Sequence, residues 1–108
     1  MRKSEEVDAW YQQLAPKDQA KVDTVVERLA SEGNLLRMPL SRSLGEGLFE
    51  LRFGCEGVER RITYIFEPQR HAITLTTFRK TKQNESGEIK RARKAQSLRK
   101  YTDRKMGK

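Results

Sequence analysis

Two arginines and two lysines are the side chains of this sequence with the clearest capacity for chemistry. Arg52 and Arg61 fall in two consecutive segments that alternate polar and apolar residues, and Lys80 and Lys82 follow a third such segment. Arginine offers a phosphate two parallel hydrogen bonds, and lysine offers it a point charge or a proton. RNA can be cut without a metal or a protein nucleophile, because its own 2′-hydroxyl attacks the adjacent phosphate. Positioning and charge neutralisation are then sufficient, so the cluster suits either phosphate binding or metal-free RNA cleavage.

Other catalytic chemistries find little support. The chain has one histidine and one cysteine, so a zinc site of the usual composition is not expected. Residues 44–47 are too short and too acidic for a phosphate-binding loop, and no paired acidic motif suggests a two-metal nuclease. His71 opens a predicted strand and is more simply explained as a surface residue than as a general base. Cys55 lies in a predicted turn and is interpreted as an incidental thiol. We therefore expect no metal and no cofactor.

The positive charge of the chain is concentrated near its C-terminal end. The 108 residues carry a net charge of +8. Residues 79–108 hold 12 Lys and Arg against 3 Asp and Glu, a net charge of +9, whereas residues 1–78 have a net charge of −1. Such a segment favours a polyanionic partner, and nucleic acid is favoured over a membrane because no apolar stripe accompanies the charge. The alternative is a solvated tail that only keeps the protein soluble.

No segment of the sequence indicates secretion or insertion into a membrane. A single cysteine cannot form a disulfide within the chain. No apolar run follows Arg2 and Lys3, and no stretch approaches the roughly 20 apolar residues that span a bilayer. We expect a cytoplasmic protein without membrane contact. It should form one domain over residues 1–100, followed by a disordered basic tail over residues 101–108.

Two helices are predicted in the first third of the chain. Ser4 is a suitable N-cap for the first helix, and Pro16 suits the first position of the second, which Gly33 would end. The first has apolar residues at helical spacing at Val7, Trp10, Tyr11 and Leu14, and the second at Val22, Val25, Val26 and Leu29. Because the join between them is short, we expect an antiparallel helical hairpin.

A β-meander is predicted after an irregular connection over residues 34–47. Alternation with a period of two indicates strands over residues 48–53, 60–67 and 72–78, and their short connections make them antiparallel neighbours. A further helix follows from residue 88 to about residue 100. The predicted fold class is α+β, with the helical hairpin packed on a three- to four-stranded antiparallel sheet and a basic C-terminal helix.

The alternation assigns the side chains of the strands to two faces. The apolar face, which should pack on the helical hairpin, holds Phe49, Leu51, Phe53, Ile62, Tyr64, Phe66, Ile73 and Leu75. The polar face, expected to be solvated, holds Glu50, Arg52, Arg61, Thr63, Thr74 and Thr76. Two arginines on adjacent strands of one face repel each other, and a bound anion would relieve that repulsion. An ordinary salt bridge from Glu50 is the alternative explanation.

Four segments, taken in order, resemble a known family. They are Leu44-Gly45-Glu46-Gly47-Leu48-Phe49-Glu50-Leu51-Arg52-Phe53, Arg61-Ile62-Thr63-Tyr64-Ile65-Phe66, Phe78-Arg79-Lys80-Thr81-Lys82-Gln83 and Glu88-Ile89-Lys90-Arg91-Ala92. Their order and spacing resemble the phage-derived, HigB-like branch of the RelE/ParE toxin superfamily, over residues 7 to about 99. The resemblance implies a RelE-like fold and the toxin of a type II toxin–antitoxin pair. Such toxins cleave messenger RNA on the translating ribosome without a metal, and a small helix-turn-helix antitoxin neutralises them.

The resemblance also implies roles for individual residues. Arg61 matches the family's phosphate-stabilising arginine, Arg52 matches the arginine of its Glu-Leu-Arg motif, and Lys80 and Lys82 match its basic strand-end motif. These four are the expected catalytic residues. The expected RNA-binding residues, which would contact ribosomal RNA for the most part, are Arg79, Lys90, Arg91, Arg93 and Lys94.

The chain departs from the family in two places, and two alternative functions stay open. The family's usual strand before the first helix is missing from the predicted elements. Asn84, Glu85 and Ser86 stand where family members often carry a tyrosine or histidine, so no general base is identified. Because the superfamily includes toxins that inhibit gyrase without cutting RNA, a non-enzymatic gyrase inhibitor is the main alternative. A regulatory nucleic-acid-binding protein is the other.

Overall fold

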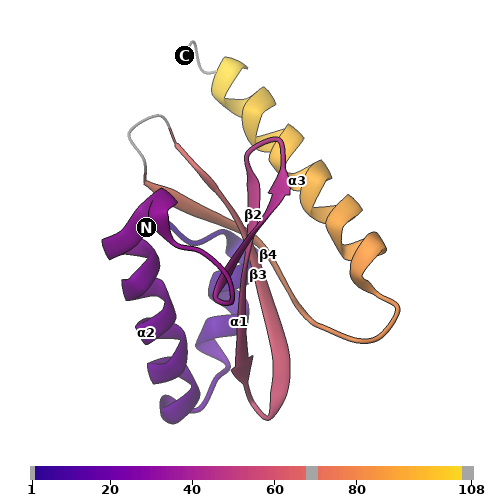
Figure 1. Cartoon of the computed structure of the whole chain (residues 1–108). Coiled ribbons are helices and arrows are strands. Elements are labelled where there is room, and N and C mark those ends of the chain that lie inside the picture. Colours follow the sequence, from indigo (N-terminus) through magenta and orange to yellow (C-terminus); the bar gives the residue numbers. More distant parts are fainter. Residues whose placement is uncertain (1, 68–70, 106–108) are drawn as a thin grey trace.

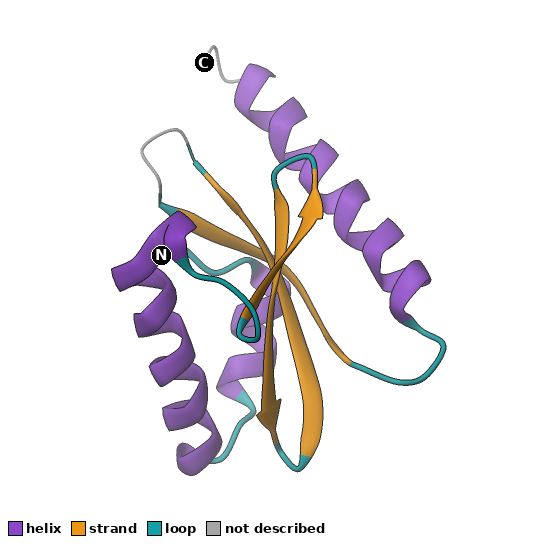
Figure 2. Ribbon diagram, viewed as in Figure 1, coloured by secondary structure: helices purple, strands orange, loops and turns teal. Residues whose placement is uncertain are grey.

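The fold pairs a helical hairpin with a four-stranded antiparallel sheet and a C-terminal helix. The computed structural model describes residues 2–67 and 71–105. Its elements are α1 (Glu5–Gln12), α2 (Pro16–Glu32), a 3₁₀ turn (Gly33–Leu35), β1 (Ser41–Gly45), β2 (Leu48–Cys55), β3 (Val58–Phe66), β4 (Ala72–Arg79) and α3 (Glu85–Lys105). The strands follow one another in the sheet in the order β1-β2-β3-β4. Helices α1 and α2 lie on one side of the sheet and α3 on the other (Figure 1, Figure 2). The predicted α+β fold class is confirmed.

The boundaries of the hairpin helices follow from local sequence. The Ser4 hydroxyl accepts a hydrogen bond from the backbone N–H of Val7 at 3.3 Å, so it caps α1 as predicted. Pro16 is the first residue of α2, where its missing N–H costs no hydrogen bond. Gly33 follows α2 with a positive φ of 54°, a conformation that glycine adopts without strain.

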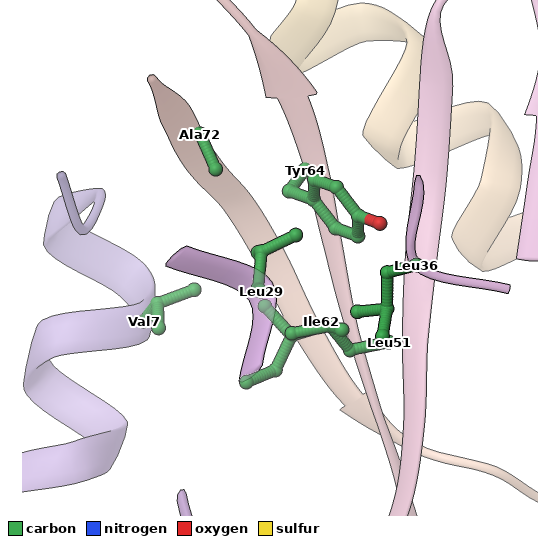
Figure 3. Close-up of a cluster of buried hydrophobic side chains, with 7 residues drawn as sticks. All are labelled: Val7, Leu29, Leu36, Leu51, Ile62, Tyr64 and Ala72. Atoms are coloured by element: carbon green, nitrogen blue, oxygen red, sulfur yellow. The ribbon is translucent and has the colours of Figure 1, made fainter. Parts of the chain in front are cut away.

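The main core lies between the helical hairpin and the sheet. It is made of buried side chains from α1, α2, the connection after α2 and three strands: Val7, Leu29, Leu36, Leu51, Ile62, Tyr64 and Ala72 (Figure 3). The ring of Tyr64 stacks on that of Phe49 with 5.4 Å between centroids, and its hydroxyl is hydrogen-bonded to the Ser41 hydroxyl at 2.5 Å. The hydrogen bond offsets the cost of burying the phenol oxygen in this apolar environment. We call this side of the sheet the hairpin face.

The connection after α2 contains a strand that sequence patterning did not indicate. Residues 41–45, expected to be irregular, form β1 and pair with β2 in register, with Ser41 opposite Leu51 and Arg42 opposite Glu50. The segment has no apolar alternation of its own. It becomes a strand because β2 offers it a free edge and because Ser41 reaches Tyr64 in the core.

The apolar side chains of β4 lie on the opposite face from the predicted one. Ala72, not Ile73, pairs with Phe66, so Ala72 faces the hairpin. Ile73 and Leu75 pack instead with Leu48, Ile65 and Ala92 on the other side, and Thr74, expected on the polar face, is the partner of Tyr64. The prediction was wrong because β4 is buried on both sides, so the alternation of its apolar and threonine side chains does not tell which of them face the helical hairpin.

The polar face of the sheet is largely buried, not solvated as expected. Glu50, Arg61, Thr63 and Thr76 are all buried there, and the Thr63 and Thr76 hydroxyls are hydrogen-bonded at 2.6 Å. Helix α3 lies on this side of the sheet, with the Ala92 side chain fully buried against it. The small side chain lets the helix approach closely. We call this side the arginine face, after Arg52 and Arg61.

Both ends of the described chain differ from expectation. Helix α3 runs to Lys105, so residues 101–105, expected in a disordered tail, are helical, while residues 106–108 lie outside the described residues. At the other end, Arg2 forms a parallel bridge with Ile73, through hydrogen bonds to Ala72 and Thr74 of 3.0 Å each. Arg2 therefore adds one paired residue at the outer edge of β4, and no strand precedes α1 among the described residues.

Candidate functional site

Arg52 and Arg61 form the centre of the candidate site. They are directly opposite each other on β2 and β3, which confirms that they share one face. Glu50 lies on the same face two residues before Arg52, and Arg42 of β1 is the register partner of Glu50. Side chains directly opposite in an antiparallel pair have Cβ atoms roughly 5 Å apart. Three adjacent strands therefore bring three arginines around one carboxylate.

The carboxylate of Glu50 lies between the two arginines without hydrogen-bonding to either. Its Oε1 is 3.9 Å from Nε of Arg52 and 3.9 Å from Nε of Arg61, and its side chain is fully buried. Neither oxygen accepts a hydrogen bond from the described residues. Glu50 thus reduces the repulsion between the arginines, as the alternative salt-bridge explanation predicted, but the Nε–H group of each arginine has no acceptor among the described residues.

Burial and charge act in opposite directions on Glu50. Desolvation raises its pKa above the ordinary value, and the charge of Glu85 raises it further. The nearby charges of Arg61, Arg42 and Arg52 lower it, but the net shift is upward. A carboxyl with a raised pKa beside cationic groups is typical of functional sites, although buried ion pairs in purely structural roles show the same behaviour.

The two arginines differ in accessibility and keep free donors. The side chain of Arg52 is 28% exposed, and its Nη1 lies 3.2 Å from the sulfur of Met38. The Arg61 side chain is only 6% exposed, and its Nη1 donates to Glu59 at 3.3 Å and to the Arg60 carbonyl at 3.1 Å. The Nη2 groups of both arginines donate to no described residue. An anion could reach Arg52 directly and Arg61 at the inner end of the same site.

Glu85, the first residue of α3, connects the rim of the site. Its carboxylate lies 3.5 Å from Nη1 of Arg42 and 3.8 Å from Nζ of Lys80. Asn84 fixes the preceding loop, since its side chain accepts a hydrogen bond from the Thr81 N–H at 3.0 Å. Lys80 is therefore joined to the arginine cluster through Glu85. Lys82 is exposed and makes no ion pair with the described residues.

Sequence reasoning missed Arg42 and Glu85. Arg42 falls in the predicted irregular connection, where no face of a sheet can be assigned to its side chain. Only the pairing of β1 with β2 brings it beside Glu50. Glu85 stands out in the sequence only because family members often carry a tyrosine or histidine in that place. Its approach to Arg42 joins residues that are 43 positions apart, which no local pattern encodes.

The residues expected to bind RNA divide into two groups. Arg79, Lys90 and Lys94 are exposed. Arg91 and Arg93 are instead engaged within the molecule. Arg91 donates to both oxygens of the Glu6 carboxylate and to Glu88, and it thereby fastens α3 to α1. Partial burial would raise the pKa of Glu6, but hydrogen bonds from Arg91 and from the Thr77 N–H outweigh this and lower it.

Arg93 holds the β1–β2 turn against α3. Its Nη2 donates to the Leu44 carbonyl at 2.5 Å and its Nη1 to the Gly45 carbonyl at 2.8 Å. Gln96, one turn further along α3, donates to the Glu46 carbonyl at 2.9 Å. The sequence placed Arg93 in an RNA-binding segment, whereas its donors are taken up by the backbone of this turn.

We expect Arg93→Ala to lower the free energy of unfolding by about 1–2 kcal/mol, because two charge-assisted hydrogen bonds at a partly exposed position are lost. Urea unfolding at neutral pH measures the effect. Lys94→Ala is the matched control, since Lys94 is exposed on the same helix and should change stability by less than about 0.5 kcal/mol. Equal stability of the two variants would show that Arg93 does not hold the turn.

Two residues considered for catalysis lie away from this cluster. His71 directly precedes β4 and lies at the end of the sheet far from Arg61. Ala72, the first residue of β4, pairs with Phe66, whereas Arg61 pairs with Phe78 near the other end of the strand. Cys55 is buried, and its burial raises the pKa of the thiol, which disfavours the nucleophilic thiolate. In residues 2–67 and 71–105, no three metal-binding side chains of His, Cys, Asp or Glu gather into a cluster. None of the described helices is long and apolar enough to cross a membrane.

The comparison with protein families gives a match over most of the chain. The family model described as phage derived protein Gp49-like (DUF891) matches residues 9–100, a span that includes both central arginines, Arg42, Glu50 and Glu85. Neither the curated proteins nor the solved structures contain a match to the chain.

Proposed function

Because this chain belongs to the phage-derived Gp49-like family, which is toxin-like and occurs in toxin–antitoxin contexts, we propose that it is a type II toxin that cleaves messenger RNA. One observation carries the proposal. Arg52 and Arg61 face each other across two strands, and the carboxylate between them leaves the Nε–H group of each without an acceptor among the described residues. This geometry suits a phosphate that accepts hydrogen bonds from both guanidinium groups. The resemblance to HigB-like toxins favours the same activity.

The cleavage step follows from the chemistry of RNA. The 2′-hydroxyl loses its proton to solvent, and its oxygen attacks the adjacent phosphorus. The bond from phosphorus to the 5′-oxygen breaks, and the 5′-oxygen takes up a proton, so the products are a 2′,3′-cyclic phosphate and a 5′-hydroxyl. Negative charge accumulates on the phosphorane oxygens, where Arg52 and Arg61 stabilise it. Lys80 at the rim offers a further charge to the same phosphate or a proton to the leaving oxygen. No metal ion or other cofactor is invoked in this step.

Glu50 acts on this step through the arginines. Its side chain is fully buried, so it does not touch the RNA, and we assign it as a positioning residue. A fixed negative charge 3.9 Å from each Nε keeps two like-charged side chains side by side before the phosphate arrives. Preorganisation of this kind lowers the cost of stabilising the transition state, because the charges need not be gathered during the reaction.

The remaining expectations concern partners. Translating ribosomes bring the messenger, and exposed Lys90 and Lys94 on α3, with Lys82 beside it, would contact ribosomal RNA. A small helix-turn-helix antitoxin, expected from the resemblance, would neutralise the toxin in the cytoplasm.

The deep burial of Arg61 favours one alternative function. A catalytic arginine must reach the phosphate, yet the Arg61 side chain is only 6% exposed. A toxin that binds its target without chemistry needs no such access, and gyrase inhibition is the form of that activity known in the superfamily. Such a toxin would cause DNA damage and filamentation and would leave messengers intact.

Induced expression in bacteria tests the proposal. Growth is followed after induction, and the 5′ ends of messengers are mapped across the transcriptome. Growth arrest with new 5′-hydroxyl ends inside translated regions, in register with codons, is the expected result. Growth arrest with intact messengers and damaged DNA would show that the protein inhibits gyrase and is not a ribonuclease. Normal growth with abundant folded protein would rule out both kinds of toxin.

A further inference from the structure

A second pair of arginines lies across the next pair of strands. Arg60 of β3 and Arg79 of β4 are register partners, so their Cβ atoms are roughly 5 Å apart on the hairpin face. Like charges in this position destabilise a sheet unless a counter-charge offsets them. For Arg52 and Arg61 the buried Glu50 supplies that charge. For the second arginine pair, Arg60 and Arg79, no described residue supplies a carboxylate within ion-pair distance.

Arg60 is held in place by neutral groups only. Its guanidinium carbon lies 4.4 Å from the centre of the Trp10 ring, and its Nε donates to the Thr77 hydroxyl at 3.0 Å. No described carboxylate lies within 4.0 Å of either arginine of the second pair. From further away, the carboxylate of Glu56 acts most strongly on Arg60, and the more weakly acting carboxylates of Glu6 and Glu88 are bound by Arg91. Among the described residues, neither arginine of the second pair forms a direct ion pair, so both guanidinium groups can still pair with an anion.

The backbone beneath the second pair is rigid. Asn84 donates to the Arg79 carbonyl at 2.7 Å, and the Lys80 N–H donates to the Glu59 carbonyl at 2.8 Å. The Trp10 ring fixes the plane of the Arg60 guanidinium by a cation–π contact. Arg79 is exposed and its side chain contacts no described polar group, so its donors are available. A fixed arginine beside a free one suits a tetrahedral anion.

We propose that Arg60 and Arg79 bind a second phosphate of the RNA strand whose neighbouring part occupies Arg52 and Arg61. The inference rests on the proposed function and adds a substrate subsite to it. Arg60 and Arg61 are consecutive in β3, so their side chains leave opposite faces at the same end of the sheet. A single strand that leaves Arg61 passes over this end of the sheet and reaches the second pair. Single-stranded RNA is flexible enough to make that turn, whereas a duplex is not.

The salt dependence of RNA binding tests the subsite. The probe is a short single-stranded RNA with 2′-O-methyl riboses, which cannot be cleaved by its own 2′-oxygen. Each lost phosphate contact makes the slope of log K against log salt shallower by about 0.7. We expect this change for Arg79→Gln and for Arg60→Gln. Arg28→Gln is the matched control, because Arg28 lies on α2 in an ion pair with Glu32 and its replacement should leave the slope unchanged.

The charge reversal Arg79→Glu separates binding from a structural effect. It places a carboxylate opposite Arg60, so the variant should be more stable, with a Tm raised by roughly 1 to 5 °C. It should nevertheless bind the probe more weakly than Arg79→Gln does. A raised Tm with a wild-type salt slope would overturn the subsite, as would equal slopes for Arg79→Gln, Arg28→Gln and the wild type. Arg60→Gln is interpreted only if its circular dichroism matches the wild type, and Arg79→Gln carries the test otherwise.

The failure of the subsite and the failure of the proposed function give different results. New messenger 5′ ends in cells, together with an unchanged salt slope for Arg79→Gln, would show that the protein is a ribonuclease without the proposed subsite. Intact messengers would contradict the proposed ribonuclease activity, whatever the salt slopes show.

Discussion

Replacing Arg61 with glutamine is expected to reduce messenger cleavage by at least about 100-fold, because removal of one preorganised donor from a developing oxyanion has effects of this size. Growth after induction should return to that of uninduced cells, and the new 5′ ends should disappear. The measurement is the one described for the wild type, with both proteins expressed to equal soluble levels. A folded Arg61→Gln protein that still cuts messengers would show that Arg61 is not a catalytic residue.

Two further variants make the Arg61 result specific. Arg61→Lys keeps the positive charge beside Glu50 but loses the planar pair of donors, so it should also be strongly impaired. Arg28→Gln removes an arginine far from the arginine face and should cleave like the wild type. Wild-type activity in Arg61→Lys would mean that a point charge is sufficient and that the two-donor geometry plays no part.

Glu50→Ala is expected to lower the free energy of unfolding by about 3 kcal/mol. The Arg61 side chain would then lie 94% buried with its charge compensated only by the exposed Glu59, and breaking a buried ion pair on one side costs about 3–5 kcal/mol. We place the effect at the lower end because Glu59 stays in contact at 3.3 Å. Urea unfolding measures it. A loss below about 1 kcal/mol would show that Glu50 does not stabilise the arginines.

The raised pKa of Glu50 adds a pH dependence whose sign can be worked out. The folded state holds the proton of Glu50 more tightly than the unfolded state, whose pKa is near 4.5. The resulting stability is fully present below that value and is lost as the pH rises through the raised pKa. Glu50→Gln cannot titrate, so the stability of the wild type relative to Glu50→Gln should fall from acid to neutral pH. A difference that is constant, or that rises with pH, would contradict the upward shift.

Local patterns in the sequence were sufficient for the helical hairpin and for the first arginine pair. The N-cap at Ser4, the start at Pro16 and the end at Gly33 depend on interactions within a few residues, so the sequence states them directly. Arg52 and Arg61 share a face because each lies in phase with the polar residues of its own strand, Glu50 and Thr63. Their role in phosphate chemistry stays a prediction, since no ligand contact tests it.

Only the tertiary structure decided what surrounds the arginines. Strand β1 exists because β2 offers it an edge, and this pairing brings Arg42 to Glu50. Helix α3 covers the arginine face of the sheet, which was expected to be solvated because its side chains are polar. The same helix places Glu85 at the rim of the arginine cluster. The pairing of β1 and the position of α3 both depend on contacts between residues far apart in the chain. The free energy of such contacts depends on which surfaces meet in the folded protein. The sequence by itself determined which side chains could bind a phosphate. Packing determined which of them are buried, which are already paired and which keep their donors free.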